Sequence, residues 1–432
     1  MFQIALFQSD ITPPLGHPLC AGWYPPAKSI ETPLVAKGII LIAEGQKPVV
    51  LCALDWSELS NGDYDRWRQE IAAAVDTDAD RVAVQCIHAH DTPWPDRDAQ
   101  DILDAAGHPN VIMTTPWPEQ TRADAAAAAK AALATLQPCT HVATGSATVE
   151  DIASNRRVMG DDGRVKYVRY TRTPDPVVRA EPIGLIDPLL RTLSFYNGDK
   201  PVTHLHYYAV HPTSYDGTGD VTPEFVGLAR NQCTQEDGVE HIYFTGCAGN
   251  ITAGKFNDGN TENRRIFTER IHTAMRAAMA DAEANQTRAP LTSLVWLTQP
   301  AALPPREDMH EADLMAEIER DTAHVKTKSR AALMLTYLRR WRQPIRITAL
   351  HLNNDIAVLN LPGEAFIEYQ IYAQQLRPKD FIAVASYGDL GTGYITMKKS
   401  FEEGGYEPVD AFVSGEAEVV MNAAIEKVIA LD

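Results

Sequence analysis

The sequence is short of basic residues and has no long apolar run. Lysine and arginine together number 39 against 57 aspartates and glutamates, so the formal net charge at pH 7 is −18. A protein that binds nucleic acid needs a basic surface to neutralise phosphates, and a polybasic membrane anchor needs clustered lysine and arginine. No window approaches the length of a membrane-spanning helix. We therefore expect neither a nucleic-acid partner nor an integral membrane segment.

Cysteine is also scarce, and its spacing excludes the common metal and disulfide motifs. None of the six cysteines belongs to a CxxC pair or a zinc-ribbon spacing, and several lie in apolar runs such as residues 51–54 and 84–87. This placement is typical of small buried hydrophobic residues rather than of a disulfide framework. Residues 1–8 have no basic segment and only a short apolar stretch, unlike a signal peptide. The expected location is therefore cytoplasmic.

Composition and periodicity favour a globular α/β protein. Hydrophobic residues at 45% and charged residues at 22% are ordinary values for a soluble domain. Strand-like and helix-like segments alternate without an internal repeat or a Gly/Ser linker. We therefore predict mixed β-sheets flanked by helices in one large domain over residues 1–432. Residues 307–342 are predicted to form a helical excursion, interpreted as a hairpin packed on the sheet rather than a cap over a cleft. The predicted strands are 2–7, 35–43, 48–54, 81–87, 191–196, 202–210, 240–245, 345–350, 355–361 and 381–385, and the main predicted helices are 63–75, 119–136, 261–285, 307–341, 365–376 and 416–431.

Two histidines follow one of the predicted strands directly. His88 and His90 come after the apolar run 82–87 and are two residues apart, so in extended chain they share a face. Imidazole is the commonest nitrogen ligand of zinc, and such a pair offers two ligands, or one ligand and one acid/base group. Two loop histidines that only make hydrogen bonds would give the same pattern.

A third histidine closes another apolar strand. His211 precedes Pro212, which keeps its backbone out of a helix. His204 and His206 lie on the opposite parity of the same strand, so we interpret them as packing residues rather than ligands.

Two oxygen donors follow later strands. Glu364 comes after the run 358–361 and is predicted to begin a helix, where a lone glutamate usually serves the helix dipole. Tyr394 follows a Gly-Thr-Gly segment, and tyrosine is rare as a zinc ligand. Two histidines, a carboxylate and one further oxygen would nevertheless suit a catalytic zinc that leaves room for water.

The order of short motifs along almost the whole chain resembles the neutral/alkaline ceramidase family. The similar segments are Asp-Ile-Thr-Pro-Pro-Leu-Gly at 10–16, Ala-Gly-Trp at 21–23, the strand ending in Asp at 51–55, His-Ala-His at 88–90, Ser-Asn-Arg-Arg at 154–157, Ile-Asp-Pro at 186–188, Ala-Val-His-Pro at 209–212, Leu-Pro-Gly-Glu at 361–364, Tyr-Ile-Thr at 394–396 and Tyr-Glu at 406–407.

This resemblance implies a catalytic domain with one bound Zn²⁺ that activates water for attack on a carbonyl carbon. The implied zinc ligands are His88, His211, Glu364 and Tyr394. The implied catalytic residues, which polarise the carbonyl, stabilise an oxyanion or move a proton, are His90, Arg156, Tyr406 and, less directly, Thr252. Asp55 and Asp220 are candidates for carboxylates that orient a ligating histidine.

The sequence also departs from the family pattern. Residues 249–253 read Gly-Asn-Ile-Thr-Ala where the family has G-D-V-S-P, so Thr252 replaces a serine sometimes assigned as a nucleophile. Its methyl group makes direct attack less favourable than attack by metal-activated water. Residues 88–93 read His-Ala-His-Asp-Thr-Pro in place of H-T-H-S-G-P, and 432 residues leave no room for the family's C-terminal immunoglobulin-like domain.

These observations together predict a zinc-dependent hydrolase of the ceramidase type that cleaves an amide in a small or medium-sized polar molecule rather than ceramide. A metal-dependent lactonase or esterase acting on a sugar-acid-like substrate is the alternative. A catalytically silent binding protein with the same fold is a second alternative, although none of the four implied ligands is missing. A Ser/His/Asp hydrolase is disfavoured, because no G-x-S-x-G motif occurs. The sequence sets neither the oligomeric state nor the metal used in vivo.

Overall fold

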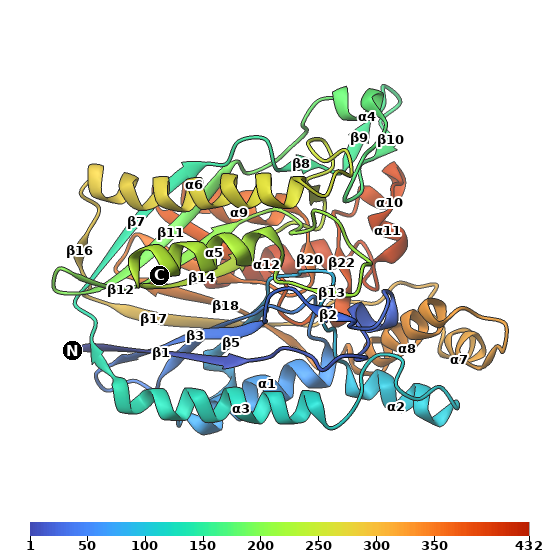
Figure 1. Ribbon diagram of the computed structural model, residues 1–432, viewed down its shortest axis with the longest axis horizontal. Helices are drawn as coiled ribbons and strands as arrows, with labels where there is room; N and C mark the ends of the chain where they lie inside the picture. The colour runs from blue at the N-terminus through green and yellow to red at the C-terminus, as the bar shows by residue number, and fades with distance from the viewer. Residues whose placement is uncertain (432) are drawn as a thin grey trace.

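The computed structural model describes residues 1–431, which build three main sheets flanked by helices (Figure 1). The first sheet has the strand order β5–β4–β3–β1–β6 and combines antiparallel pairs with one parallel pair, β4–β5. Helices α1 (Asn61–Ala74) and α3 (Trp117–Ala132) cover its lower side in the figure. Its strands are β1 (Phe2–Asp10), β3 (Val35–Ala43), β4 (Val49–Leu54), β5 (Val82–Cys86) and β6 (Gln137–Pro138).

The second sheet has the order β14–β12–β11–β7–β16, in which β12 and β14 are parallel. Helix α5 (Glu224–Asp237) makes the crossover between them, and α6 (Asn263–Ala284) packs on β7 and β11. Strand β7 approaches α6 closely at Gly145. A Cβ atom at this position would lie 2.0 Å from the carbonyl oxygen of Ala278, so only glycine fits. The strands are β7 (His141–Thr148), β11 (Leu189–Asn197), β12 (Lys200–Tyr208), β14 (Glu240–Thr245) and β16 (Ala289–Pro290).

The third sheet has the order β17–β18–β19–β21 and ends in the parallel pair β19–β21. Helix α9 (Ile367–Leu376) forms that crossover, and α12 (Ala417–Ile429) packs against β17 and β18. Two further short strands, β20 (Glu364–Ala365) and β22 (Tyr394–Ile395), pair in parallel. The main strands are β17 (Leu294–Ala301), β18 (Ile345–Leu352), β19 (Ile356–Asn360) and β21 (Phe381–Ala385).

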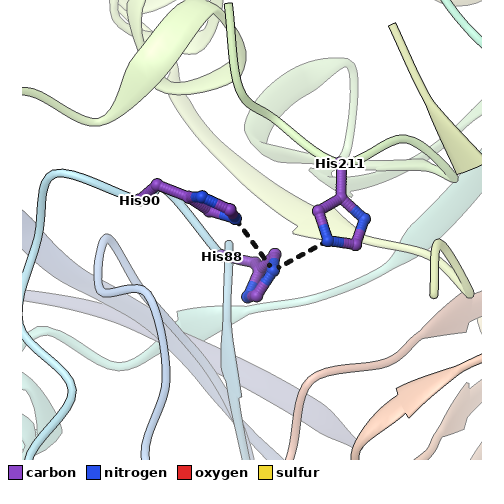
Figure 2. Close-up of side chains that lie close together, drawn as sticks. All are labelled: His88, His90 and His211. Atoms are coloured by element: carbon purple, nitrogen blue, oxygen red, sulfur yellow. Dashed lines mark hydrogen bonds between the residues drawn. The ribbon is translucent and has the colours of Figure 1, made fainter. Parts of the chain in front are cut away.

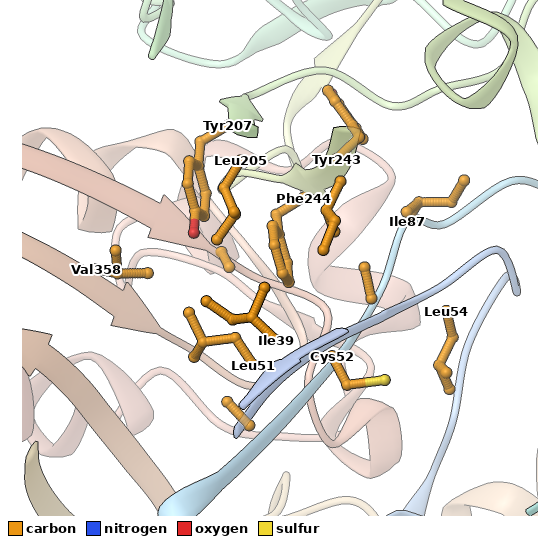
Figure 3. Close-up of a cluster of buried hydrophobic side chains, with 14 of the residues drawn as sticks. Ile39, Leu51, Cys52, Leu54, Ile87, Leu205, Tyr207, Tyr243, Phe244 and Val358 are labelled. Atoms are coloured by element: carbon orange, nitrogen blue, oxygen red, sulfur yellow. The ribbon is translucent and has the colours of Figure 1, made fainter. Parts of the chain in front are cut away.

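The three sheets share one hydrophobic core. Leu51 of the first sheet, Leu205 and Phe244 of the second and Val358 of the third belong to one cluster of buried side chains (Figure 3). Burying each large apolar side chain contributes about 1.5–3 kcal/mol of transfer free energy. This shared burial fixes the sheets relative to one another and so brings their strand ends together.

Hydrogen bonds join the carboxyl ends of the three parallel pairs. The hydroxyl of Thr245, at the end of β14, donates to the carbonyl oxygen of Ile87 at 2.7 Å, and the amide of Ser386 donates to the carbonyl oxygen of Thr245 at 2.9 Å. The side-chain amide nitrogen of Gln85 donates to the carbonyl oxygen of Ala385 at 2.8 Å. Parallel strands commonly present functional groups at such carboxyl ends.

The predicted fold class, mixed α/β sheets flanked by helices, is confirmed, and most predicted strands are present. The excursion at 307–342 is helical but consists of two helices, α7 (Glu311–Glu319) and α8 (Val325–Arg340), which lie at the right of the view in Figure 1. Helix α2 (Arg97–Ala105) and the long strands β7 and β17 were not predicted. Nor was the short antiparallel pair of β9 (Arg157–Met159) and β10 (Val165–Val168). The six cysteines are buried and free, as their apolar surroundings indicated. No helix within residues 1–431 combines the length and hydropathy that a membrane crossing requires.

Candidate metal centre

Three predicted ligands follow the carboxyl ends of three parallel strands, one from each sheet. His88 comes after β5, His211 after β12 and Glu364 after β19. Glu364 does not begin a helix, as predicted, but lies in the short strand β20, and α9 begins at Ile367. His88 has a left-handed backbone with φ of 69°. Such a conformation costs about 1–3 kcal/mol in a residue with a side chain and is concentrated at functional sites.

The polar atoms of these three side chains form a nearly equilateral triangle. The Nε2 atoms of His88 and His211 are 3.1 Å apart, and the Oε2 atom of Glu364 lies 3.1 Å from His211 Nε2 and 3.5 Å from His88 Nε2 (Figure 2 shows the two rings). All three side chains are buried.

The tautomer of each ring follows from its other nitrogen. His88 Nδ1 lies 3.1 Å from the carbonyl oxygen of Ser57, and His211 Nδ1 lies 2.7 Å from that of Ala248. A carbonyl oxygen only accepts, so each Nδ1 carries the proton. Burial lowers the pKa of both imidazoles well below the ordinary value, which keeps them neutral. Both Nε2 atoms therefore present a lone pair towards the carboxylate of Glu364.

This arrangement fits a divalent cation such as zinc. Zinc–nitrogen and zinc–oxygen distances of about 2.0–2.1 Å in a tetrahedron place neighbouring ligand atoms about 3.3 Å apart. The three observed separations bracket that value. The Oε2 atom of Glu364 is buried and has no hydrogen-bond partner within residues 1–431, which is the condition expected of a carboxylate oxygen that serves a cation.

Tyr394 lies beside this triangle. It is the register partner of Glu364 in the β20–β22 pair, and its hydroxyl accepts a hydrogen bond from Arg156 Nη1 at 3.0 Å. Burial raises the pKa of the phenol well above its ordinary value, and the guanidinium acts in the opposite direction. The role of Tyr394 as a fourth ligand stays a prediction.

Arg156 provides a fixed positive charge at the edge of the triangle. Its Nη2 donates to His211 Nε2 at 3.2 Å, and its guanidinium carbon lies 5.6 Å from the ring centre of Tyr394 and 5.4 Å from that of Tyr406. These separations are within the range of cation–π contacts, which help to hold the guanidinium beside the cluster. Arg156 and Tyr406, both predicted site residues, are therefore brought to the cluster.

His90 also reaches the cluster. Its Nε2 lies 3.3 Å from His88 Nε2 (Figure 2), and its Nδ1 lies 3.1 Å from the hydroxyl of Tyr24 and 3.4 Å from Asp216 Oδ2. Burial raises the pKa of Asp216, but the hydrogen bonds from His90 and Tyr24 outweigh it and lower the pKa to about 2. His90 thus connects the three candidate ligands to an ionised carboxylate.

Thr252, the fourth predicted catalytic residue, is not brought to the cluster. It is buried, and its hydroxyl donates to the carbonyl oxygen of Arg169 at 3.4 Å while accepting from the amide of Gly254 at 3.1 Å. The hydroxyl therefore makes its hydrogen bonds with backbone groups. Thr252 is also absent from the lining of the cavity that His88 and Glu364 border.

The two carboxylates expected to orient ligating histidines have other partners. Asp55 is fully buried and forms a two-point ion pair with Arg230, at 2.6 and 2.9 Å. Asp220 accepts from the hydroxyl of Ser29 at 2.6 Å and lies 3.4 Å from Lys28 Nζ. That expectation is wrong, because backbone carbonyls rather than carboxylates take the Nδ1–H groups of the ligand rings.

His204 and His206 lie within β12 and belong to a separate polar cluster. His206 Nε2 lies 2.8 Å from His241 Nδ1, and His241 Nε2 lies 3.1 Å from Asp237 Oδ2. The hydroxyl oxygen of Thr192 lies 2.8 Å from His206 Nδ1 and donates its proton to that nitrogen. In the resulting chain of hydrogen bonds every donor meets an acceptor. A larger cavity of about 670 Å³ borders this cluster. The satisfied chain does not call for a cation, so we place the candidate site at His88 and His211.

The candidate centre borders, through His88 and Glu364, a cavity of about 100 Å³ that is rich in aromatic side chains. Sequence reasoning missed most of these residues, because they come from segments far apart in the chain. The lining residues are Cys20, Trp23, Tyr24, Glu58, His88, His90, Trp94, Lys326, Glu364, Gly393, Tyr394, Tyr406, Asp410 and Phe412.

Comparison with known proteins identifies the fold but not a sequence family. No protein-family model and no curated protein matches the sequence. The structure is similar to that of neutral ceramidase from Pseudomonas aeruginosa, with a TM-score of 0.72 and 14% identity over 99% of this chain and 74% of that chain. A structure described as ceramidase complexed with C2 is similar to the same extent. The chain therefore has the fold of the neutral ceramidases.

Proposed function

We propose that this protein is a zinc-dependent hydrolase that cleaves an amide C–N bond in a small or medium-sized polar molecule. The observation that carries the proposal is a triangle of two unprotonated imidazole Nε2 atoms and one carboxylate oxygen that has no hydrogen-bond partner within residues 1–431. Each of the three side chains comes from a different sheet. The likeness of the fold to the neutral ceramidases supports the same reaction class.

The proposed ligands are His88, His211, Glu364 and Tyr394. When bound, zinc would supply Lewis acidity and lower the pKa of water at the site. Backbone carbonyls hold both imidazoles in the tautomer that a metal requires. The carboxylate of Glu364 offsets part of the charge of the cation.

The remaining residues have roles that follow from their positions. Arg156 stays protonated and directs N–H groups towards the cluster, where negative charge develops on a carbonyl oxygen under attack. His90 faces the cluster through Nε2 and an ionised Asp216 through Nδ1, so it can deliver a proton to the departing nitrogen. In the balanced reaction, water provides the oxygen for the acyl carbon and the protons for the amine. Tyr406 closes one side of the cavity.

Metal analysis tests the ligand set directly. We expect about one equivalent of zinc in the purified protein and a large loss in the variant His211→Ala. His204→Ala is the matched control, because it removes a buried histidine outside the proposed centre. Zinc retained at full stoichiometry in the His211 variant would refute the assignment.

Product analysis tests the reaction class. A panel of N-acyl amides and lactones, followed by pH-stat titration and amine detection, separates amide cleavage from lactone opening. Amide cleavage releases an amine, whereas lactone opening releases acid alone. A lactonase with the same ligands is the alternative outcome. Full zinc occupancy with no turnover of either class would favour a binding protein.

A further inference from the structure

Glu58 is a buried carboxylic acid that the proposed mechanism does not use. It follows β4, is 3% exposed, and its Oε2 atom has no hydrogen-bond partner in the described chain. The nearest ring nitrogen, His88 Nδ1, is 3.6 Å from Oε1, which is too long for a hydrogen bond. That nitrogen already donates to the carbonyl oxygen of Ser57. A buried acceptor without a donor is costly and is uncommon unless a ligand supplies the donor.

The surroundings of Glu58 form a small pocket for a substituent. Glu58 lines the same cavity as the metal centre, together with the rings of Trp23 and Trp94, whose centroids are 5.4 Å apart. The two indole N–H groups are used elsewhere, because Trp23 donates to Ser329 at 3.0 Å and Trp94 donates to Ser60 at 2.7 Å. The tryptophans therefore offer apolar ring surface, and Glu58 offers hydrogen-bond acceptors among them.

No lysine or arginine in residues 1–431 forms an ion pair with Glu58, and its one contact with a basic group is the 3.6 Å separation from His88 Nδ1. Lys326 lines the cavity, but its Nζ lies over the Trp23 ring at 4.4 Å. Arg156 is engaged with Tyr394 and His211. The donor that satisfies Glu58 must then arrive with the ligand.

We propose that Glu58 accepts a hydrogen bond from a hydroxyl or ammonium group that the substrate carries next to its scissile carbonyl. Glu58 lines the same cavity as His88 and Glu364, and one of its oxygens lies within 4.8 Å of ligand atoms of both, so a group bound to Glu58 lies close to the proposed metal centre. The substrate class is therefore an acyl compound with a hydrogen-bond-donating substituent on the acyl side or the leaving-group side. This inference rests on the proposed hydrolase function.

Matched substrates test the inference. Each set contains a hydroxylated, an amino-substituted and an unsubstituted version of one amide, assayed with the wild type and with Glu58→Ala. We expect the wild type to favour a substituted version by at least about tenfold in kcat/KM, because a site built around a polar contact rejects analogues that lack it. Glu58→Ala should reduce this preference to near unity, chiefly through a loss of kcat/KM for the substituted versions.

Glu58→Gln separates the two donor types. Glutamine keeps a carbonyl acceptor but has no charge, so a preference for hydroxyl should largely survive and a preference for ammonium should be lost. Glu402→Gln, on an exposed glutamate of α10 (Ser400–Glu403), is the control and should leave every ratio unchanged.

Two further readouts exclude other roles for Glu58. Its carboxylate lies within 4.8 Å of ligand atoms of His88 and Glu364, so loss of zinc in Glu58→Gln would identify a metal ligand and overturn the proposal. Thermal unfolding distinguishes a structural role, because removing an unpartnered buried carboxyl should leave Tm unchanged or higher. A lower Tm with substrate preference intact would also overturn it.

Absence of any turnover would count against the proposed hydrolase and not against Glu58. In that case calorimetric titration with the hydroxylated, amino-substituted and unsubstituted carboxylic acids, which are the hydrolysis products, gives the same comparison without catalysis. Tighter binding of a substituted acid by the wild type, lost in Glu58→Ala, supports the subsite. Equal binding of all three acids refutes it.

Discussion

The Nε2 atoms of His88 and His211 lie 3.1 Å apart although neither carries a proton. Each ring donates its Nδ1–H to a backbone carbonyl, and the carboxylate of Glu364 completes the group. Three acceptors in one buried place are stabilised by a cation between them. The backbone contacts of the rings therefore shape this candidate cation site as much as the side chains themselves do.

Zinc is expected to stabilise the fold through this centre. At a free zinc concentration a hundredfold above Kd, binding to the native state alone adds about 2.7 kcal/mol to the free energy of unfolding. Dialysis against a chelator should lower Tm, and added zinc should restore it. Glu364→Gln should abolish the zinc response, and its zinc-free form should be at least as stable as zinc-free wild type. Differential scanning calorimetry measures both effects, and an unchanged zinc response in the variant would contradict the prediction.

Arg156 is expected to affect turnover far more than metal binding. Arg156→Lys keeps the positive charge but loses the planar fork that donates to both Tyr394 and His211. Removal of one donor to a developing oxyanion commonly lowers kcat by about 10²–10³. Steady-state kinetics and zinc analysis on the same preparation check this. The control Arg164→Lys, on an exposed arginine, should behave like the wild type.

The sequence predicted the position of the candidate ligands that directly follow apolar strands. His88 and His211 each come directly after an apolar run, and that local pattern predicted their position. Their role as metal ligands was implied by the family resemblance and stays a prediction. Glu58 also follows a strand, β4, but a single glutamate at such a position is common in proteins and usually forms an ion pair or caps backbone amides. The convergence of the three strands depends on burial shared by the three sheets, which no local pattern reveals.

The partners of buried charges were the least predictable feature. Asp55 has the strand-end position of a functional carboxylate, yet it pairs with Arg230, which is 175 residues away in the chain. The groups that do orient the ligand rings are the carbonyl oxygens of Ser57 and Ala248. Every residue has a carbonyl oxygen, so side-chain identity carries no signal for such partners.

Thr252 is expected to be dispensable for catalysis. Its hydroxyl bonds to backbone groups of Arg169 and Gly254 and does not line the cavity. Thr252→Val keeps the shape of the side chain and should change kcat by less than about threefold, since no transition-state contact is lost. The lost hydrogen bonds should lower the free energy of unfolding by about 1–3 kcal/mol. A fall in kcat of about a thousandfold with zinc retained would instead indicate a nucleophile.

Asp55 is expected to matter for stability and not for the metal. Its ion pair with Arg230 is fully buried, so Asp55→Ala leaves an unpaired guanidinium in the core. Removal of one partner from such a pair typically costs about 3–5 kcal/mol. Urea unfolding measures this loss. The zinc content of the folded variant should remain that of the wild type, whereas a selective loss of zinc would restore the idea that Asp55 supports a ligand.

His17 is expected to make the fold sensitive to mild acid. Its ring packs against Trp117 with centroids 4.6 Å apart, Nδ1 lies 2.7 Å from the hydroxyl of Thr114, and burial lowers the pKa of the imidazole to about 4. The unfolded chain, with a pKa near 6.5, binds more protons between these two values. Stability should therefore rise with pH from about 4 to 6.5 and fall on acidification, by about 3 kcal/mol in all. His17→Gln cannot titrate, so its free energy of unfolding should depend less on pH across this window. Equal pH slopes for the two proteins, measured by urea unfolding at pH 4.5, 5.5 and 6.5, would show that His17 does not control this dependence.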